Sequence, residues 1–408
     1  MDVPDHRRLG RQLGIFATDE ACGAGLPLWL AAGATVRREI ERFVVELERR
    51  HGYRHVNTPA MAKRELYERS GHWTHYHQDM YPPMDVGGEQ VVLRPMLCPH
   101  HILIFAAEPR SLRDLPFRLA EIGPMFRYER SGVVGGLSRV RQMTLNDGHV
   151  FCAPEQVEAE IADILAMVDE AYRTLGIPPA RLRFSRAGTG AKYAADARAW
   201  RESESMIRAA LDKLGAEYTE AEGEAAFYGP KIDLQVTDPH GREETLSTIQ
   251  ADLHLPARFA LRFRRGDAGE QPVMIHRSIV STMERMVAHV LEVHDGALPV
   301  WLAPTQVVVL PVSAAAHAHA VRVHDALAGA AVRAEIDDRD ATLAARVRAA
   351  QQQRIPYVAV VGDREASSDT VAVRVRPGTQ LPPMSVDGFV ALVREMVTSR
   401  ATGTLSTQ

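Results

Sequence analysis

The sequence predicts two domains: an α+β domain over residues 1–298 and a smaller α/β domain over residues 307–408, joined by a linker at 299–306. Three observations support this. A chain of 408 residues is longer than one typical domain and can bury a large core. Residues 126–149 have the pattern of two strands around a glycine-rich turn, which is typical of an antiparallel hairpin. Beyond two prolines in the segment LPVWLAPTQ, strands and helices alternate, as in α/β domains.

The composition is that of an ordinary globular protein, with 46% hydrophobic and 25% charged residues. The formal net charge of -4 argues against a generally cationic surface, so any RNA contact must use local basic patches. Cys22, Cys98 and Cys152 show no paired spacing, which fits a reducing cytoplasm better than a disulfide scaffold. No apolar run is long enough to span a bilayer, and the N-terminus lacks the apolar core of a signal peptide. We therefore expect a cytoplasmic protein without membrane contacts.

The first domain begins with an amphipathic helix, whose apolar positions are Val36, Ile40, Phe43, Val44 and Leu47. It should end near Gly52, because glycine suits a helix C-terminal cap. A short strand over 55–61 follows, and Pro59 forbids a central ladder hydrogen bond there. An amphipathic core helix beside an edge strand explains this pattern. The later elements are a strand and helix over 91–105, a helix over 154–175, short strands around a helix at 200–215, the strand in FYGPKIDLQV, and a strand running into a helix over 274–292.

The second domain consists of alternating strands and helices. The strands are predicted over 307–312, 332–336, 357–362 and 370–376, and the helices over 314–329, 342–353 and 386–398. This order predicts a small sheet that is largely parallel or mixed.

The hairpin at 126–149 carries a cluster of arginines. Alternation along a strand puts Arg127 and Glu129 on one side of the first strand, and Arg139 and Arg141 on one side of the second. Three guanidiniums would then lie near one another, and guanidinium suits phosphate because its donors form a planar, permanently charged fork. A surface hairpin with solvated arginines is the alternative, and the spacing alone does not decide between the two.

The segment FRYE resembles motif 2 of the class II aminoacyl-tRNA synthetases, and the segments around it resemble the threonyl-tRNA synthetases in particular. The similarity runs from Asp5-His6-Arg7-Arg8 to about residue 396. It implies an antiparallel sheet flanked by helices, followed by an α/β anticodon-binding domain. It also implies ATP-dependent activation of L-threonine and transfer to the 3′ end of tRNA(Thr). The first helix and the strand with Pro59 resemble motif 1, which builds the dimer interface of that class, so a homodimer is expected.

Cys98, His149 and His276 are weak metal signals by themselves, because no compact zinc spacing links them. Their segments, MLCPHH, NDGHVFC and VMIHRS, resemble those that supply one Cys and two His ligands to a single zinc in threonyl-tRNA synthetases. The resemblance therefore implies one zinc per chain, with coordination positions left open. Threonine offers an amino group and a hydroxyl to such a metal, whereas isosteric valine has no hydroxyl to offer.

The resemblance also assigns the ATP-binding residues. Arg127 is expected at the α-phosphate, Glu129 at the adenine and Arg139 at the γ-phosphate, with magnesium bridging the phosphates. Met283-Glu284-Arg285 resembles motif 3, whose arginine covers the adenine ring. A charge pair on an ordinary helix is the other interpretation of that segment.

For the amino acid and the tRNA, Asp147 is expected to accept the threonine hydroxyl, and Tyr228 to line the amino-acid pocket. Packing of Tyr228 as a cross-strand aromatic beside Phe227 is the alternative. His72, in SGHW, matches a histidine that assists transfer to tRNA, and a neutral imidazole is a sensible base there. Arg348, Glu365 and Arg374 match anticodon-contacting positions, and a solvated surface is the alternative for these three.

Several positions depart from the family pattern. Residues 142–147 read Gln-Met-Thr-Leu-Asn-Asp where Gly-Phe-Thr-Gln-Asp-Asp is usual, so Met143, Leu145 and Asn146 differ in the pocket. Ser281 replaces a glycine, and residues 245–248 read Thr-Leu-Ser-Thr in place of Gln-Cys-Gly-Thr. In the second domain, Asp340 and Ala344 replace an asparagine and a glycine. The changes in the first domain touch the ATP or amino-acid pocket, so we expect them to bear on substrate choice and rate.

The sequence begins where the catalytic domain of the family begins, so a form without the N-terminal and editing domains is expected. Serine also carries an amino group and a hydroxyl, and we hypothesise measurable serylation that this chain does not correct. A paralogue that loads an amino acid onto a non-tRNA acceptor is one alternative, against which Glu365 and Arg374 count. A non-catalytic tRNA-binding or regulatory paralogue is another, against which Arg127, Arg285 and the three metal ligands count.

Overall fold

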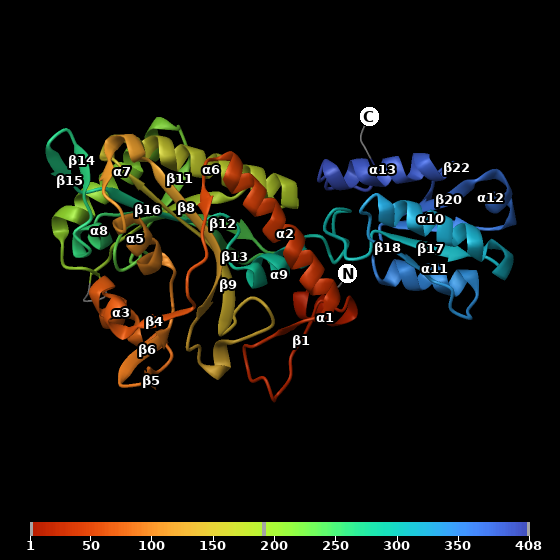
Figure 1. Ribbon diagram of the computed structural model, residues 1–408, viewed down its shortest axis with the longest axis horizontal. Helices are drawn as coiled ribbons and strands as arrows, with labels where there is room; N and C mark the ends of the chain where they lie inside the picture. The colour runs from red at the N-terminus through yellow and green to blue at the C-terminus, as the bar shows by residue number, and fades with distance from the viewer. Residues whose placement is uncertain (1–2, 190–192, 406–408) are drawn as a thin grey trace.

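The structure, a computed structural model, describes residues 3–189 and 193–405. It has a larger part built on one broad sheet and a smaller part near the C-terminus, which lie end to end (Figure 1). Each part has its own cluster of buried apolar side chains. This arrangement agrees with the two predicted domains in order and in kind.

The larger part is organised by an 8-stranded sheet. In spatial order its strands are β11 (Tyr218–Glu222), β10 (Arg181–Arg186), β12 (Lys231–Thr237), β13 (Glu243–Asp252), β16 (Val273–Ser278), β9 (Gln142–Cys152), β8 (Phe117–Phe126) and β3 (Arg54–His55). Neighbouring strands from β10 to β8 are antiparallel, and only the edge pairs β10–β11 and β3–β8 are parallel among the described residues. The predicted antiparallel sheet is confirmed.

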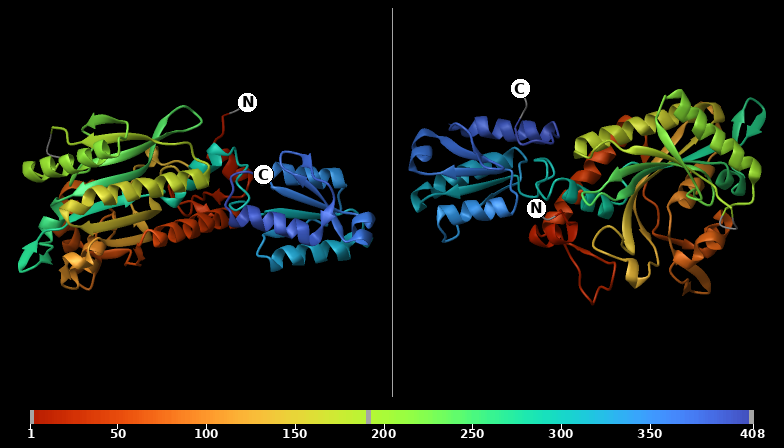
Figure 2. Two further views of the ribbon diagram at one scale, coloured as in Figure 1. Left: turned by 90° about the horizontal axis from the view of Figure 1, so that it is seen from above. Right: turned by 180° about the vertical axis from the view of Figure 1, so that it is seen from behind.

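One face of this sheet is covered by helices (Figure 2). They are α2 (Ala31–Arg50), α6 (Val157–Leu175), α7 (Ala197–Lys213) and α9 (Met283–Val293). Their apolar positions recur at helical spacing, and these side chains join those of every second sheet residue in one buried cluster. Local signals set their ends: the Thr282 hydroxyl accepts from the Arg285 N–H at the start of α9, and Gly176 caps α6 in the left-handed region.

The opposite face is covered only in part. The helices on this side are α3 (Arg64–Ser70), α4 (His72–Tyr76), α5 (Cys98–Ala106) and α8 (His254–Arg258). Two 3-stranded sheets flank them, formed by β4 (Met61–Lys63), β6 (Glu89–Leu93) and β5 (Met84–Val86), and by β15 (Ala268–Glu270), β14 (Phe263–Arg265) and β7 (Arg110–Ser111). At the N-terminus, α1 (His6–Gln12), β1 (Phe16–Ala17) and β2 (Leu28–Trp29) lie beside the loop that joins β8 and β9 (Figure 1).

The smaller part is an α/β domain with a mixed sheet, as predicted. Its strands are β18 (Ala334–Ile336), β17 (Val307–Pro311), β19 (Tyr357–Val361), β20 (Thr370–Val375) and β21 (Thr379–Gln380), with β22 (Met384–Ser385) paired to β20. β17 is parallel to β18 and β19, whereas β20 is antiparallel to β19. The helices are α10 (His317–Gly329), α11 (Leu343–Gln352), α12 (Asp363–Ser368) and α13 (Val386–Thr398).

The segment between the two parts is packed. Val300 belongs to the buried cluster of the smaller part, whereas Trp301 belongs to that of the larger part. The Trp301 ring makes an edge contact with Phe43 of α2 at 5.7 Å between centroids. The guanidinium of Arg333 donates to the Trp301 carbonyl at 2.7 Å and to Glu39 at 3.0 Å. The predicted linker therefore takes part in both cores.

Three local predictions differ from the structure. The strands of the central hairpin end at Phe126 and resume at Gln142, so its arginines lie in the connecting loop. Backbone pairing continues for one step beyond the strands, where the Arg127 N–H donates to the Arg141 carbonyl at 2.9 Å, and the loop opens after it. The strand predicted over 55–61 is divided into β3 and β4, with Pro59 between them. Tyr228 precedes β12 and so is not a strand residue, although its ring contacts that of Phe227 at 4.9 Å between centroids.

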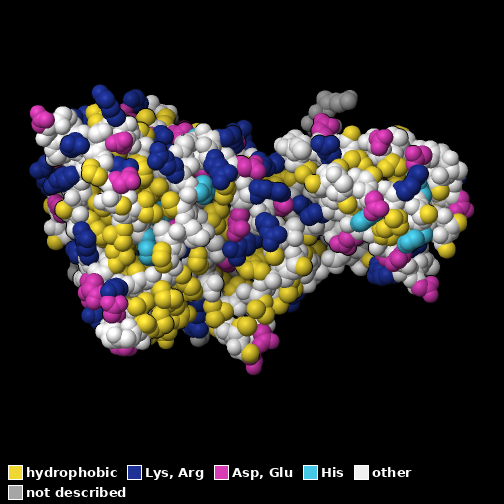
Figure 3. Space-filling model, in the orientation of Figure 1, with side chains coloured by type: hydrophobic (Ala, Val, Ile, Leu, Met, Phe, Trp, Pro, Cys, Tyr) yellow, Lys and Arg dark blue, Asp and Glu magenta, His cyan; other side chains and the backbone are white. Residues whose placement is uncertain are grey.

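The surface in Figure 3 carries interspersed basic and acidic side chains over both parts. This distribution agrees with the net charge of -4. Among the described residues, no helix is both long and apolar enough to cross a membrane.

Candidate active site

A cavity of about 690 Å³ opens on the less covered face of the large sheet. It is lined by alternate residues of β9, by residues of β13 and β16, by the loop between β8 and β9, and by the start of α9. On β9, for example, Met143, Leu145, Asp147 and His149 face the cavity, while Val150 and Cys152 join the helix-covered core. The strand period thus separates the lining of the cavity from the core.

Cys98, His149 and His276 meet at the inner end of this cavity. His149 and His276 are directly opposite each other in the β9–β16 ladder, and Cys98 is the first residue of α5. One nitrogen or sulfur atom from each lies within 4.8 Å of the others, and all three side chains are buried. One ion can therefore be reached by all three, with the ligand set of a Cys-His-His zinc site.

The ring of His149 is oriented for a metal. Its Nδ1 is 2.8 Å from Nδ1 of His101, whereas its Nε2 is buried and has no hydrogen-bond partner among the described residues. Burial, together with the neighbouring His276 and His101, lowers the pKa of His149 well below its usual value. The ring is therefore neutral, which is the ligand form of imidazole, and the orphaned Nε2 fits a bound cation.

His101 begins a buried chain of partners behind His149. Its Nε2 donates to Glu121 at 3.2 Å, and Glu121 also accepts from the Arg94 guanidinium at 2.9 Å and from the Thr58 hydroxyl at 2.7 Å. The pKa of the Glu121 carboxyl is lowered to about 2 despite its burial, because these donors favour the charged form. A carboxylate behind a ligating histidine is a common outer partner of a metal site. Sequence reasoning missed these residues, although the pair His100-His101 beside Cys98 was a visible signal.

Asp252 is the hydrogen-bond partner behind His276, as His101 is behind His149. Its Oδ2 lies 2.8 Å from His276 Nε2, which leaves Nδ1 of that ring for a metal. The other oxygen, Oδ1, accepts from the backbone N–H groups of His254 and Leu255 and so holds the start of α8. Sequence reasoning missed Asp252 as well, because only the β13–β16 pairing brings it beside His276.

His72 lies behind the wall of the cavity. This side chain is fully buried and is not among the residues that line the cavity. Its Nε2 is 3.6 Å from the Cys98 sulfur and its Nδ1 is 2.8 Å from the Ser70 hydroxyl. Burial lowers the pKa of His72 to about 3, and burial raises the pKa of the Cys98 thiol. The His72 ring therefore contacts the Cys98 side chain from behind the cavity.

Asp147 and Tyr228 stand beside the cluster. Asp147 lines the cavity, and its Oδ1 is 3.8 Å from His149 Nε2. Burial raises the pKa of the Asp147 carboxyl, so this group favours a hydrogen-bond or cationic partner. The Tyr228 ring stacks on His276 at 4.7 Å, and its hydroxyl donates to Gln250 at 2.5 Å.

The predicted ATP-binding residues lie at the outer end of the cavity. Arg127 is placed over the Tyr76 ring at 5.8 Å, and its Nε is buried without a partner in the described part of the chain. Arg139 pairs with Glu129 at 2.9 Å. Arg285 donates to the Ser138 carbonyl at 3.5 Å and to the Thr245 carbonyl at 3.4 Å. The cavity thus has a thiol and imidazoles at one end and three guanidiniums at the other.

The residues that differ from the family pattern make specific contacts in the structure. Asn146 donates to Glu48 of α2 at 2.8 Å and accepts from the Ile279 N–H at 3.1 Å. The hydroxyl of Ser247 is buried and bonded to that of Tyr172 at 2.8 Å. Ser281 has φ of +58°, in the left-handed region that favours glycine. Met143 and Leu145 both line the cavity, and Leu145 puts an apolar side chain where the family pattern has glutamine.

The anticodon residues predicted in the second domain are not equivalent. Arg348 on α11 and Arg374 on β20 are exposed. Arg374 is paired with Val358, which packs in the cluster beneath α11, so both arginines belong to the α11 side of the sheet. Glu365 makes a local contact instead: its carboxylate accepts the Gly362 N–H at 3.0 Å and so caps α12.

Comparison with known proteins identifies the family. Residues 81–294 match the family described as tRNA synthetase class II core domain (G, H, P, S and T), and residues 306–396 match the family described as Anticodon binding domain. The Threonine--tRNA ligase of Halalkalibacterium halodurans is 49% identical over 391 residues, which is 95% of this chain and 60% of that protein. The Threonine--tRNA ligase of a Geobacillus species is 48% identical over 398 residues, which is 96% of this chain and 62% of that protein.

A crystal structure described as the RNA binding domain of threonyl-tRNA synthetase from Cryptosporidium parvum superposes with a TM-score of 0.92. It is 33% identical and covers 99% of both chains. The chain belongs to the threonyl-tRNA synthetase family. It spans about 60% of the length of the curated relatives that it matches.

Membership of the threonyl-tRNA synthetase family confirms the predicted fold, a class II core followed by an anticodon-binding domain. The chain also has a donor set that fits zinc: one thiol, two imidazoles, and a carboxylate or histidine behind each ring.

Proposed function

We propose that this chain activates L-threonine with ATP and transfers it to the 3′ end of tRNA(Thr). The observation that carries the proposal is that the Cys98, His149 and His276 cluster and the arginines at 127 and 285 line one cavity. Family membership supports the same activity.

Zinc is the metal proposed for the cluster, one per chain, because its preferred donors are thiolate and imidazole. When bound, zinc would act as a Lewis acid that takes the amino and hydroxyl groups of threonine. Asp147 would accept the hydrogen bond of that hydroxyl, and the Tyr228 ring would close the pocket over His276. Valine leaves the buried Asp147 carboxylate without a donor, which disfavours it more than a shape mismatch would.

At the other end, Arg127 would hold the α-phosphate of ATP and the threonine carboxylate. Its buried Nε without a partner supports this role, because a ligand oxygen would satisfy it. Arg139 would leave Glu129 to take the γ-phosphate, while Glu129 turns to the adenine and Arg285 covers the ring. The carboxylate attacks the α-phosphorus in line, the bond to the β-phosphate breaks, and pyrophosphate leaves with Mg²⁺. Positioning and positive charge supply the catalysis.

Recognition of tRNA is proposed for the second domain, through Arg348 and Arg374 on the α11 side of its sheet. Glu365 contributes by holding α12 through Oε2, and its other carboxylate oxygen would accept from a base. We further propose a homodimer, formed as in class II synthetases through α2 and the strand after it, and a cytoplasmic location. Sedimentation of the purified protein measures the dimer.

The test is amino-acid-dependent exchange between ATP and pyrophosphate, measured on metal-analysed protein with threonine, serine and valine. We expect exchange with threonine, weaker exchange with serine, none with valine, and about one zinc per chain. Charging of tRNA(Thr) follows as the second step. The matched variants are Asp147→Asn, which should lose preference for threonine over valine, and Asp238→Asn, which lies in a separate pair with Arg242 and should retain it.

Other outcomes separate the alternatives. Exchange without charging points to a paralogue that loads a non-tRNA acceptor. Binding of tRNA without exchange points to a non-catalytic paralogue, in which the apolar wall formed by Met143 and Leu145 has displaced the amino acid.

A further inference from the structure

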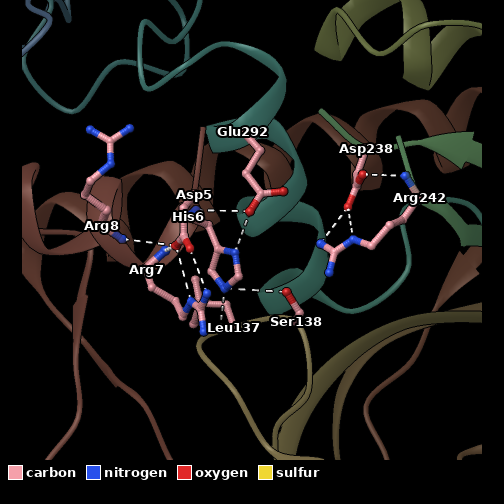
Figure 4. A network of polar contacts seen from close by, with 9 residues as sticks. All are labelled: Asp5, His6, Arg7, Arg8, Leu137, Ser138, Asp238, Arg242 and Glu292. Atoms are coloured by element: carbon pink, nitrogen blue, oxygen red, sulfur yellow. Dashed lines mark hydrogen bonds and ion pairs between the residues drawn. The ribbon is translucent and has the colours of Figure 1, made fainter. Parts of the chain in front are cut away.

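The loop between β8 and β9 is tied to the N-terminal helix by one side chain (Figure 4). The His6 ring on α1 lies between Glu292 at the end of α9 and the backbone of Leu137 in the loop. Its Nδ1 is 2.8 Å from Glu292 Oε1, and its Nε2 receives the Leu137 N–H at 3.2 Å. The two bonds join three segments that are far apart in the sequence.

These partners assign the state of the ring. Glu292 also accepts the His6 backbone N–H at 3.0 Å, and its donors hold the pKa of this carboxyl below its usual value despite burial. A carboxylate can only accept and the Leu137 N–H can only donate, so the ring proton is on Nδ1. Its Nε2 is then an acceptor, matched to the Leu137 N–H. The ring therefore bridges a carboxylate and a backbone donor in one tautomer.

The point of contact lies next to a proposed phosphate ligand. Gly135 and Arg139 pair across a tight turn, with bonds of 3.0 and 3.4 Å between their backbones, and Leu137 is at the tip of that turn. The next carbonyl, that of Ser138, accepts from the Arg285 guanidinium. A side chain that fixes Leu137 consequently fixes the turn on which Arg139 is mounted and the carbonyl that orients Arg285.

The fit around His6 is close. Gly136 has φ of +54°, and a Cβ atom there would come within 2.2 Å of His6 Nε2 and 2.8 Å of Arg7. The Leu137 side chain is fully buried in the main core, so the turn has an apolar anchor as well as the polar one. The absence of a side chain at 136 is thus required for the His6 contact.

We propose that His6 is a positioning residue for ATP, which sets the turn at 135–139 through the Leu137 N–H while Glu292 holds its ring. This inference rests on the proposed function, because it takes Arg139 and Arg285 as ligands of ATP. His6 itself does not line the cavity and touches no reacting atom, although its Nε2 lies 3.5 Å from the hydroxyl of Ser138, which is a lining residue.

Two isosteric variants test which bond matters. His6→Asn keeps a donor at the place of Nδ1 for Glu292 and has no acceptor at the place of Nε2. His6→Gln places an amide oxygen near Nε2 for Leu137 and gives up the side-chain bond to Glu292. We expect the dissociation constant for Mg²⁺ and a non-hydrolysable ATP analogue, measured by calorimetry, to rise about tenfold in His6→Asn and less than threefold in His6→Gln.

Further measurements separate positioning from simple stabilisation. In threonine-dependent exchange, His6→Asn should raise KM for ATP and leave KM for threonine within about twofold. Gly136→Ala should behave as His6→Asn does, because its Cβ displaces the ring. If Glu292 pairing were the purpose of His6, His6→Gln would have the lower melting temperature and the weaker ATP binding, and the inference would be overturned.

The calorimetry does not depend on the amino acid. Wild-type protein that binds the analogue but shows no exchange with threonine refutes the proposed function only, and the two His6 variants still decide the inference. Equal affinity of wild type and His6→Asn refutes the inference only. Wild-type protein that does not bind the analogue refutes both.

Discussion

Asp252 Oδ2 lies 2.8 Å from Nε2 of His276, and both side chains are buried. The carboxylate therefore fixes the proton of His276 on Nε2 and leaves Nδ1 as the only ring nitrogen that can bind a cation.

Replacement of Asp252 by asparagine should weaken zinc binding about 10- to 100-fold. The Asn amide can donate to Nε2, which favours the tautomer with the proton on Nδ1, where a metal cannot bind. Oδ1 remains to cap α8, so the fold should be retained. Competition with a chromophoric chelator measures the affinity, and Asp238→Asn is the control. Equal affinity of Asp252→Asn and wild type would contradict the orientation described for His276.

Arg127→Gln should lower threonine-dependent exchange by about 100- to 1,000-fold, the range found when one preorganised charge-stabilising donor is removed. The variant should keep its zinc and melt no lower than wild type, because the Arg127 Nε is buried without a partner among the described residues. Exchange, zinc content and thermal melting measure the three quantities. A lower melting temperature with unchanged exchange would assign Arg127 to the fold instead.

Ser281→Gly should stabilise the protein by about 1 kcal/mol, because a non-glycine residue is strained at φ of +58°. The conformation cannot relax easily, since the Ser281 carbonyl accepts the Asn146 N–H at 3.1 Å. The midpoint of urea unfolding measures the change. Ser278→Gly, on the adjoining strand β16, is the control and should be destabilising.

His289 should make the protein less stable in mild acid. Burial lowers its pKa to about 4, although Glu292 and Asp238 oppose this shift, and both ring nitrogens are buried without hydrogen-bond partners in the described residues. Between the unfolded value of about 6.5 and the folded value, the unfolded chain binds the proton more tightly, so stability falls as the pH falls. The loss attributable to His289 should be up to about 2 kcal/mol at pH 5 relative to pH 7.

His289→Leu should remove this part of the pH dependence and be no less stable than wild type at pH 7. Urea unfolding at both pH values, for both proteins, measures the difference. A variant with the same acid sensitivity as wild type would exclude His289 as its source.

The parts of the fold that the sequence predicted well are those set by local patterns. The helix through Val36 and Phe43 and the alternation of the second domain follow from periodicity, and both are present. The extent of the strands around Arg127 was wrong, because a glycine-rich segment of this length can continue a hairpin or open into a loop. In the structure the last pairing is the backbone hydrogen bond from the Arg127 N–H to the Arg141 carbonyl.

The candidate site was predicted by resemblance more than by pattern. Nothing near Cys98 in the sequence indicates His276, because only the register of β9 against β16 brings the two segments together. His101 and Asp252 were missed for the same reason, since their partners are long-range. The burial of His72 behind Cys98 could not be predicted from its neighbours in the sequence.

The packing of residues 299–306 affects how the molecule comes apart. Val300 and Trp301 are neighbours in the chain but belong to different cores, and Arg333 ties that segment to Glu39 of α2. Unfolding of either core removes packing partners from the other core. Heating should therefore show one cooperative transition rather than two. The two domains should therefore be less stable when they are separated. A fragment that starts at residue 307 lacks the Val300 side chain, which is part of its hydrophobic core.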